Sequence, residues 1–276
     1  MGGGWWRTGE AGTGAAPAAA DPLAMLPAGG PARGLLVELG RIEYEAAWAL
    51  QRALADARRA ERVPDLLLLV EHPPTFTIGR GGDLANLLAS PAHLAALGAR
   101  VYEVDRGGDI TYHGPGQLVG YPIIDLLGRG RDVHRYLRLL EEALIRALAE
   151  LGVHAGRLPP HTGVWVGAEK VAAIGVKISR GVTLHGFALN IAPDLDHFAA
   201  IIPCGIRDKG VTSLARLLGA PPDPAAVAAR VSAHFGALAG LSWQSLDLRG
   251  RPVAALGEAI EAAGAAGFAA AARRAR

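Results

Sequence analysis

The chain has 276 residues, half of them hydrophobic, with a formal net charge of +2 and a pI near 8.9. This length and apolar content are enough for one domain with a sizeable core, flanked by tails. A mildly basic chain with only 5% aromatic residues and no basic patch interleaved with them is not expected to bind nucleic acid.

Cysteine usage and hydropathy indicate a cytoplasmic protein. The single cysteine, Cys204, cannot form an internal disulfide, so nothing in the sequence indicates an oxidising compartment. The longest uniformly apolar stretch, Leu66 to Val70, is too short to span a bilayer. Residues 1–33 lack the charged start and compact apolar core of a signal peptide. We therefore expect neither a membrane protein nor a secreted one.

The first third of the chain begins with a tail and continues as helix and strand. Residues 1–33 are rich in Gly, Ala and Pro without periodicity, which predicts a disordered extension. Apolar residues at helical spacing predict an amphipathic helix from Ile42 to about Glu61. The His72-Pro73-Pro74 sequence forces a turn, because proline cannot donate to a strand ladder. The other elements predicted here are strands at Leu66–Val70 and Thr75–Ile78 and a helical stretch at Leu84–Leu97.

The middle of the chain contains its most regular helix. Apolar residues recur every three or four positions between Asp132, a plausible N-cap, and Gly152, a plausible C′ residue. Short β-branched runs surround this helix, and a tight turn at Arg180-Gly181 predicts antiparallel pairing of the two strands that it joins. The predicted strands are Val101–Val104, Asp109–Tyr112, Leu118–Ile124, Gly163–Val166, Lys170–Ile178 and Val182–Asn190.

Helical patterns at Thr212–Leu218 and Pro224–Leu238 close the domain, and the Ala-rich end from Ala254 is a weak helix or a frayed tail. We therefore expect one domain at 34–245 and a C-terminal tail at 246–276. Runs of strands mixed with helices, rather than strict βαβα alternation, indicate an α+β fold with a mixed, largely antiparallel sheet flanked by helices.

The most informative segment runs from Arg106 to Tyr121, R-G-G-D-I-T-Y-H-G-P-G-Q-L-V-G-Y, and contains five glycines and a proline. Glycine lets the backbone approach a bound molecule closely and adopt positive φ, whereas proline fixes a turn. The composition favours a segment shaped around a ligand. A glycine-rich hairpin without a ligand is the alternative.

Cys204 lies in the sequence I-I-P-C-G-I. The proline before it stiffens the backbone and the glycine after it has no side chain to cover the sulfur, which suits an exposed nucleophile. The alternative is that Cys204 is a small buried hydrophobic residue. A thiol is mostly protonated at neutral pH, so a catalytic cysteine needs a cation or base beside it. No spacing rule selects among the candidates. They are the three lysines, Lys170, Lys177 and Lys209, and the histidines His113, His185 and His197.

Motifs for metals and nucleotides are missing from the sequence. There is no H-E-x-x-H and no C-x-x-C, and the G-P-G-Q-L-V-G segment has Val119 where a dinucleotide fingerprint requires glycine. We expect no metal and no cofactor. The arginines near the start of the long helix fit a solvated helix face or a surface for an acidic partner. They are Arg129, Arg131, Arg135 and Arg138.

Taken together, these motifs closely resemble the lipoyl(octanoyl) transferase family, also called octanoyl-acyl-carrier-protein:protein N-octanoyltransferases. The resemblance covers roughly Leu35 to Leu218. The segments that carry it are E-H-P-P-T-F-T-I-G-R at 71–80, the glycine-rich run, A-I-G at 173–175, L-H-G-F-A-L-N at 184–190 and I-P-C-G-I at 202–206.

The resemblance implies a fold like that of biotin and lipoate protein ligases, and it assigns roles to residues. Cys204 matches the acyl-thioester nucleophile of the family, and Lys170 matches its activating partner. The positions that match the walls of the acyl pocket are Arg106, Gly107, Gly108, Asp109, Ile110, Thr111, Tyr112, His113, Ala173, Ile174, Gly175, Gly186, Phe187 and Ala188.

The implied reaction is octanoyl transfer in protein lipoylation. The donor would be octanoyl-acyl carrier protein, and the acceptor a lysine of an apo lipoyl domain in a 2-oxoacid dehydrogenase or in the glycine-cleavage H protein. The thioester supplies the energy, so the reaction needs no ATP. The alternatives are an ATP-dependent lipoate or biotin ligase on the same fold, and a non-catalytic acyl-binding module in which Cys204 only packs.

Overall fold

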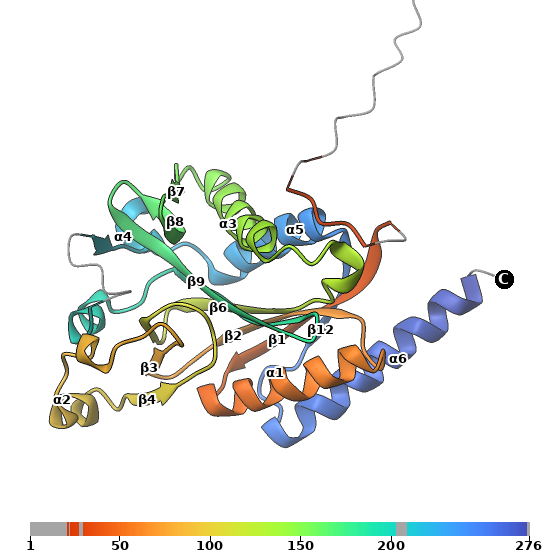
Figure 1. The fold of residues 1–276 in the computed structure, drawn as a ribbon, viewed down its shortest axis with the longest axis horizontal. Helices are drawn as coiled ribbons and strands as arrows, with labels where there is room; N and C mark the ends of the chain where they lie inside the picture. Colours follow the sequence, from red (N-terminus) through yellow and green to blue (C-terminus); the bar gives the residue numbers. More distant parts are fainter. Residues whose placement is uncertain (1–20, 22, 28–29, 203–208, 275–276) are drawn as a thin grey trace, which may run out of the picture.

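A mixed sheet with helices on both faces forms the body of the protein (Figure 1). The computed structural model describes residues 21, 23–27, 30–202 and 209–274, the last eight by their backbone alone. Within these residues the main sheet has the order β12-β1-β2-β6-β10-β9-β8-β7, with β11 paired to β9. The predicted α+β class, with its mixed and mostly antiparallel sheet, is confirmed.

Parallel pairing in the main sheet is limited to one edge and to the short strand β11. Strand β1 runs parallel to both β12 and β2, and β11 runs parallel to β9, whereas the remaining neighbours are antiparallel. The strands are β1 (Ala32–Arg41), β2 (Asp65–Glu71), β6 (Gln117–Ile123), β7 (Gly156–Leu158), β8 (His161–Val166), β9 (Glu169–Ser179), β10 (Val182–Asn190), β11 (Gly210–Val211) and β12 (Leu241–Asp247).

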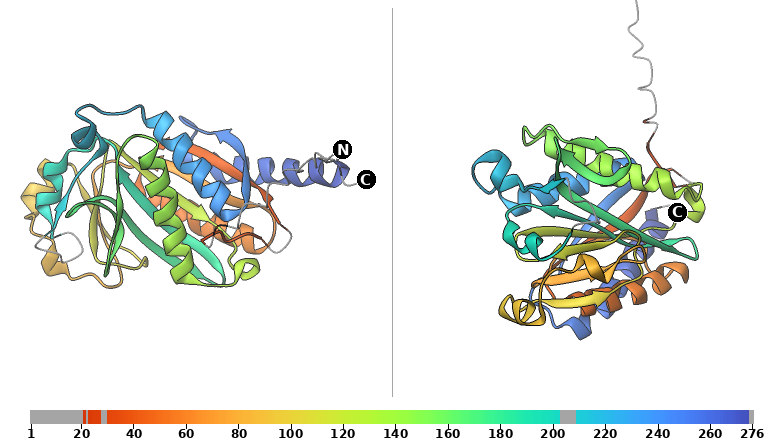
Figure 2. Two further views of the ribbon diagram at one scale, coloured as in Figure 1. Left: turned by 90° about the horizontal axis from the view of Figure 1, so that it is seen from above. Right: turned by 60° about the vertical axis from the view of Figure 1, so that its left-hand side comes forward.

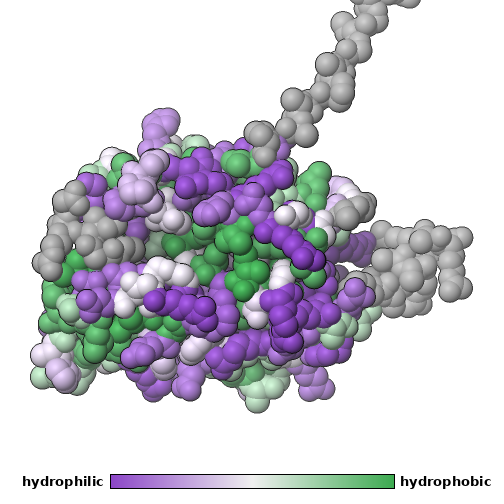
Figure 3. Space-filling model, in the orientation of Figure 1, coloured by the Kyte–Doolittle hydropathy of each residue, from purple (hydrophilic) through white to green (hydrophobic). Residues whose placement is uncertain are grey.

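Two helices cover each face of this sheet (Figures 1 and 2). On one face, α3 (Val133–Ala149) packs beside α5 (Pro224–Ala239); on the other, α1 (Tyr44–Arg59) packs beside α6 (Leu256–Arg274). Each layer contributes its own hydrophobic cluster. A band of apolar residues, flanked by more hydrophilic margins, crosses the face seen in Figure 3.

Helix α3 begins and ends where its sequence predicts. The Asp132 carboxylate accepts a hydrogen bond from the Arg135 N–H at 2.9 Å, which caps the first turn. At the other end Gly152 has φ +79° and donates its N–H to Ala149 O. Val153 donates to Leu148 O, which completes the bond pair of a Schellman motif with Gly152 at C′.

A smaller sheet, β4-β3-β5, lies at one end of the molecule (Figure 1). It has its own apolar cluster, in which Phe76, Tyr112 and Phe198 pack together. The three strands are β3 (Thr75–Ile78), β4 (Arg100–Glu103) and β5 (Ile110–His113). The first half of the glycine-rich run thus connects β4 to β5 within this sheet and includes β5, and the second half leads into β6 of the main sheet.

The predicted helical stretch at Leu84–Leu97 is two short pieces, a 3₁₀ turn at Leu84–Asn86 and α2 (Pro91–Ala96). The single-helix prediction was wrong here, because a residue before proline is pushed out of the helical region. Ser90 has extended backbone and caps α2 by accepting from the His93 N–H. The remaining helix, α4 (Leu214–Leu218), follows its prediction closely.

Part of the segment for which we predicted disorder is packed in the core. Met25 is 3% exposed and donates its N–H to Leu238 O of α5, and β1 already begins at Ala32. Arg129 is also buried, in an ion pair of 2.6 Å with Asp65, so it does not belong to a solvated helix face. Residues 1–20, 22, 28–29, 203–208 and 275–276, and with them Cys204, lie outside the described residues.

In the part of the chain that the structure describes, none of the helices combines the length and the apolar composition needed to cross a bilayer.

Candidate active site

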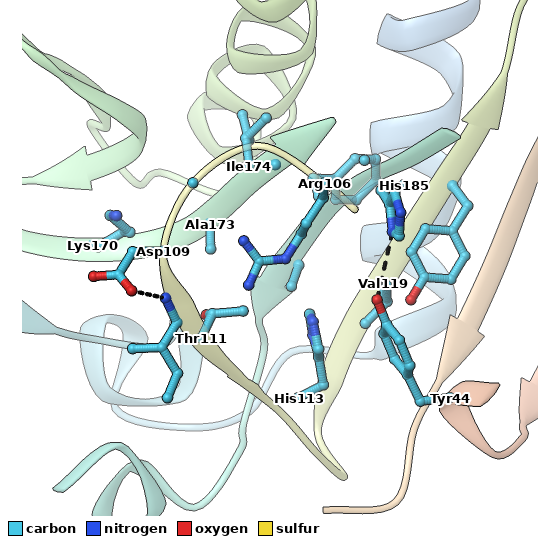
Figure 4. A pocket seen from close by; sticks show the side chains of 17 residues that line it. Tyr44, Arg106, Asp109, Thr111, His113, Val119, Lys170, Ala173, Ile174 and His185 are labelled. Carbon is cyan, nitrogen blue, oxygen red and sulfur yellow. Dashed lines mark hydrogen bonds between the residues drawn. The ribbon is translucent and has the colours of Figure 1, made fainter. Parts of the chain in front are cut away.

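A pocket lies between the glycine-rich run and strands β9 and β10 (Figure 4). Its cavity of about 50 Å³ has room for a few water molecules. Lys170 lies at one end of the pocket, and Tyr44 and His185 lie at the other. The residues that line it are Tyr44, Arg106, Gly108, Asp109, Ile110, Thr111, His113, Val119, Tyr121, Lys170, Ala173, Ile174, Gly175, His185, Gly186, Phe187 and Ala188.

Glycines let three segments of backbone meet at this pocket. Gly175 of β9 lies opposite Gly186 of β10, and a Cβ on Gly175 would come within 2.8 Å of Gly107 O. A Cβ on Gly186 would lie 2.1 Å from Gly120 O. Gly107 in turn donates its N–H to Val176 O at 2.9 Å, so the run is hydrogen-bonded to β9. The glycines are required because a side chain at these positions would separate the walls.

Arg106 holds the glycine-rich run against the smaller sheet. Its side chain is buried, and one guanidinium nitrogen donates both to Thr77 O at 2.7 Å and to Thr77 Oγ1 at 2.9 Å. The other terminal nitrogen donates to Gly107 O at 3.0 Å. The rigid fork of arginine donors suits it to fixing a loop in this way.

Asp109 closes the same loop from its other side. Its carboxylate accepts from the Ile110 N–H at 2.7 Å, from the Asp83 N–H at 3.1 Å and from Asn86 Nδ2 at 2.6 Å. These bonds connect the run to the 3₁₀ turn that precedes α2. Asp109 therefore lines the pocket with a carboxylate that is already hydrogen-bonded by the protein.

Lys170 lies near the start of β9, where three strands meet. Its Nζ lies 4.8 Å from the centroid of the Trp165 ring of β8, a cation–π distance, and the residue is 7% exposed. On the other side its backbone O accepts from the Thr212 N–H at 3.0 Å, beside β11. Lys170 faces both the main cavity and a smaller one of about 20 Å³.

The chain that leads to Cys204 is described on both sides of residues 203–208. Before them, Ile202 is buried and donates its N–H to Asn86 O at 2.8 Å. After them, Val211 of β11 is paired with Lys170 and lines the smaller cavity with it. After residues 203–208 the described chain therefore continues beside Lys170, through β11.

Tyrosines and histidines gather at the end of the pocket opposite Lys170. The Tyr44 ring stacks on the His113 ring with 5.7 Å between centroids, and its hydroxyl donates to His185 Nδ1 at 3.5 Å. His185 Nε2 lies 2.9 Å from Asp105 Oδ1. Burial lowers the pKa of His185 to about 4, despite the opposing effect of Asp105, so this ring is neutral near pH 7. Its proton is therefore on Nε2, where the carboxylate accepts it.

His72 and Tyr121 form a second hydrogen-bonded pair, next to the Tyr44 ring. His72 Nδ1 lies 2.8 Å from Ile42 O, and His72 Nε2 lies 2.7 Å from the Tyr121 hydroxyl. A carbonyl can only accept, so Nδ1 carries the proton and Nε2 accepts from Tyr121. Burial lowers the pKa of His72 to about 4 and raises that of Tyr121, so both groups are neutral.

Two of the residues expected to form the acyl pocket do not line it. Gly107 faces β9 through its N–H, as described above. The Tyr112 hydroxyl lies 2.6 Å from His197 Nδ1, and burial raises the pKa of Tyr112 to about 12. His197 bonds to Tyr112 and Lys177 forms an ion pair with Asp105, and neither residue lines the cavity that Lys170 borders. The other expected wall residues are brought together at the cavity with Lys170.

Three lining residues were not anticipated from the sequence: Tyr44, Val119 and Tyr121. Val119 and Tyr121 lie in the glycine-rich run, and the alternation of β6 places both on one face with Gln117. This alternation in the sequence could have indicated that Val119 and Tyr121 line the pocket. Tyr44 comes from α1, far away in sequence, and nothing local to it indicates the pocket.

Among the described residues, no group of three or more His, Cys, Asp or Glu side chains is arranged to hold a metal ion.

Comparison with known proteins decides the family. The family model for the lipoyl protein ligase A/B catalytic domain matches residues 43–236. An octanoyltransferase of Chloroflexus aggregans is 54% identical over 203 residues, which cover 72% of this chain and 92% of the relative. The chain belongs to the octanoyltransferase family. Octanoyltransferases are acyltransferases, so the chain is an enzyme of that class.

Other relatives agree with this assignment. An octanoyltransferase of Geobacter metallireducens is 51% identical over 201 residues, which cover 73% of this chain and 91% of the relative. Among solved structures, a lipoate-protein ligase A bound with ATP superposes with a TM-score of 0.66 at 18% identity, over 84% of this chain and 95% of that one. A structure from an archaeal lipoylation system, described as a bipartite lipoate protein ligase and its E2 lipoyl domain from Thermoplasma acidophilum, superposes with a TM-score of 0.62 at 18% identity, over 83% of this chain and 92% of that one. These two structures share the fold.

Proposed function

We propose that this octanoyltransferase moves an octanoyl group from octanoyl-acyl carrier protein to a lysine of an apo lipoyl domain, through a thioester on Cys204. The observation that carries the proposal is the placement of Lys170. It is the lysine that borders the apolar pocket, and the described chain on the far side of Cys204 is paired with it through β11. Relatives that are about half identical to this chain are octanoyltransferases, and this supports an octanoyl group as the acyl group that is transferred.

The first half-reaction loads the enzyme. The Cys204 thiolate, favoured by the Lys170 ammonium, attacks the carbonyl carbon of the octanoyl thioester on the carrier's phosphopantetheine arm. The tetrahedral adduct then expels the pantetheine sulfur, which takes a proton from Lys170. The products are octanoyl-Cys204, neutral Lys170 and the carrier with its free thiol.

The second half-reaction delivers the acyl group. The neutral amine of the acceptor lysine attacks the octanoyl-Cys204 carbonyl, an amide bond forms, and the Cys204 thiolate leaves. The amine nitrogen loses a proton, which Lys170 accepts, so that the starting state is restored. Acceptors would be lipoyl domains of 2-oxoacid dehydrogenases and the glycine-cleavage H protein. The E2 lipoyl domain named as belonging to the Thermoplasma ligase supports this class of acceptor.

The pocket suits the alkyl part of the substrate. Ile110, Val119, Ile174 and Phe187 supply apolar surface between Lys170 and the far end. Each buried methylene contributes roughly 0.8 kcal/mol to binding. A cavity of about 50 Å³ holds only a few waters, so the walls must separate when an eight-carbon chain enters.

We assign the reaction to residues 34–245, which include every lining residue. A free catalytic thiol fits a reducing cytoplasm.

The test is intact-mass analysis of the enzyme after incubation with octanoyl carrier protein and no ATP. We expect an octanoyl adduct on Cys204, which disappears when apo lipoyl domain is added and the domain gains the same mass. Cys204→Ser should form no thioester and lose transfer. Full transfer by Cys204→Ser, or transfer only with ATP and free octanoate, would support an ATP-dependent ligase instead. An unreactive Cys204 and no transfer to any lipoyl domain would support an acyl-binding module.

A further inference from the structure

Glu141 is a buried carboxylate on α3 that lies outside the acyl pocket and that the proposed reaction does not use. Helix α3 packs against β8 and β9 of the main sheet (Figure 1). The side chain of Glu141 is fully buried, which is costly for a charged group unless it is paired. Its Oε2 accepts from Arg138 at 2.6 Å and from Arg157 at 2.9 Å, and its Oε1 accepts from the Gly163 N–H at 3.1 Å. One oxygen therefore meets the arginines, and the other holds the backbone of β8.

Gly163 lies against the side chain of Lys170. A Cβ on Gly163 would lie 3.4 Å from Lys170 Cε and 3.5 Å from Lys170 Cδ, so the backbone of β8 forms one side of the space that the lysine side chain occupies. The same Cβ would come within 2.7 Å of Ala172 O, and Gly163 has φ +128°, so another residue would be strained here. A contact that holds Gly163 thus also holds the surface against which Lys170 lies.

The strand pairing at Lys170 is irregular. Trp165 of β8 is paired with Lys170, whereas the residue before Trp165 is paired with Ala172. Strand β9 therefore has one extra residue at this point, Val171, which makes a β-bulge. The pairing places the Trp165 ring and the Lys170 ammonium on one face, 4.8 Å apart. Because the ladder is interrupted here, a bond from α3 to β8 is a further restraint on the place of the ammonium.

We propose that Glu141 is a positioning residue for acyl transfer. By accepting the Gly163 N–H it fixes β8 against β9, and it thereby keeps the Lys170 ammonium where it can exchange a proton with the reacting thiols. The inference rests on the proposed role of Lys170 and extends it to a residue that does not touch the substrate. If Glu141 and its arginines only joined α3 to β7, their loss would lower stability without changing how Lys170 acts.

The test is Glu141→Met, assayed by octanoyl transfer kinetics and by the pH profile of Cys204 alkylation with iodoacetamide. An apolar side chain of similar volume is often tolerated in place of a buried ion pair, and Arg157 keeps its 2.8 Å ion pair with Glu142. With the Gly163 N–H unpaired, we expect kcat to fall by about 5 to 10-fold and the alkylation profile to move by about half a unit toward higher pH. KM for the octanoyl carrier should stay within about 2-fold, because no residue that lines the acyl pocket has changed.

Two further variants separate the hydrogen bond from the charge. Glu141→Gln has an amide oxygen that can still accept from Gly163, so it should keep the wild-type profile and at least about half of kcat. Glu142→Gln is the matched control, because it removes the neighbouring carboxylate of α3, which pairs with Arg146 and Arg157. Its kcat and its profile should both match those of the wild type.

Wild-type kcat and profile in Glu141→Met would overturn the inference. A loss in Glu141→Gln as large as that in Glu141→Met would also overturn it, since the charge and not the Gly163 bond would then be responsible. If Glu141→Met does not fold, Glu141→Asp decides, because aspartate keeps the charge but is one methylene too short to reach both Gly163 and the arginines. An unshifted profile in Glu141→Asp would then overturn the inference.

Lys170→Ala in the same assays separates this inference from the proposed function. An unchanged alkylation profile in Lys170→Ala would refute the proposed role of Lys170 itself. A shifted profile in Lys170→Ala together with an unshifted one in Glu141→Met would refute only the positioning role of Glu141.

Discussion

Asp105 Oδ1 and His185 Nε2 are joined by a hydrogen bond of 2.9 Å that ties the residue before the glycine-rich run to β10. Asp105 also forms an ion pair with Lys177 of β9. Burial alone would raise the pKa of Asp105, but the hydrogen bonds from Lys177 and His185 hold it below the ordinary value. His185 itself has φ +58°, a conformation that non-glycine residues adopt only when their surroundings impose it. These contacts fix the start of the glycine-rich run, which forms one wall of the pocket, to β9 and β10.

Stability should fall as the pH drops from about 6.5 toward 4. The pKa of His72 and that of His185 are both about 4 in the folded protein, against 6.5 for a free histidine. In this window the unfolded chain binds more protons, so lowering the pH favours unfolding, by up to about 1.4 kcal/mol per pH unit for each histidine. Urea titrations at pH 7.5 and 5.0 measure the difference.

The matched variants for this prediction are His185→Asn and His93→Gln. Asn tolerates the left-handed backbone at position 185 and cannot be protonated, so the pH dependence should become shallower. His93 is exposed on α2, and its replacement should leave the slope unchanged. Equal stability of the wild type at both pH values would contradict the prediction.

Lys170→Ala should raise the pH at which Cys204 is alkylated by iodoacetamide. Removing a neighbouring ammonium disfavours the thiolate, and an effect of about one pH unit is expected for a close pair. The measurement is the alkylation rate between pH 5 and 9, followed by mass. Lys177→Ala removes a lysine from the same strand but one that pairs with Asp105, so its profile should match that of the wild type. An unshifted profile in Lys170→Ala would remove Lys170 from its activating role.

Trp165→Leu should slow transfer by about 5-fold, because a cation–π contact of this kind contributes on the order of 1 kcal/mol to the placement of the Lys170 ammonium. Trp165→Phe keeps an aromatic face and should retain most of the rate. Because Trp165 is buried, both variants need a stability measurement beside the kinetics. Trp243→Phe, at the opposite edge of the sheet, is the control that should leave kcat alone. Equal rates for Trp165→Leu and the wild type would show that the ring does not position Lys170.

Gly116→Ala should destabilise the protein by more than about 2 kcal/mol, because the position combines positive φ with a backbone clash. Gly116 has φ +85°, and a Cβ there would lie 2.3 Å from Ala192 O. Gly128→Ala is the matched control, since nothing lies within 4 Å of its added Cβ and its φ is not positive. Chemical denaturation of the two variants measures the contrast. A loss no larger in Gly116→Ala than in Gly128→Ala would count against it.

Elements specified by nearby residues were predictable. The Asp132 cap and the Gly152 terminus of α3 each bond to backbone groups three residues away, and the Arg180-Gly181 turn, where both residues have positive φ, is equally local. The strands on either side of that turn pair as expected. By contrast, β1 and β12 were missed, because their parallel pairing joins residues about 200 positions apart. No local pattern reports such a partner.

Some features of the site could likewise be predicted from the sequence, whereas others depended on the tertiary structure. The sequence by itself determined which reactive groups are present, one cysteine and three lysines, and where glycine permits close approach, since these are properties of single residues and short motifs. Only the tertiary structure decided that Lys170 rather than Lys177 or Lys209 borders the pocket, that Tyr44 of α1 closes its far end, and which nitrogen of His185 carries a proton. Those outcomes depend on neighbours brought together by packing of the whole chain, and burial then sets their protonation.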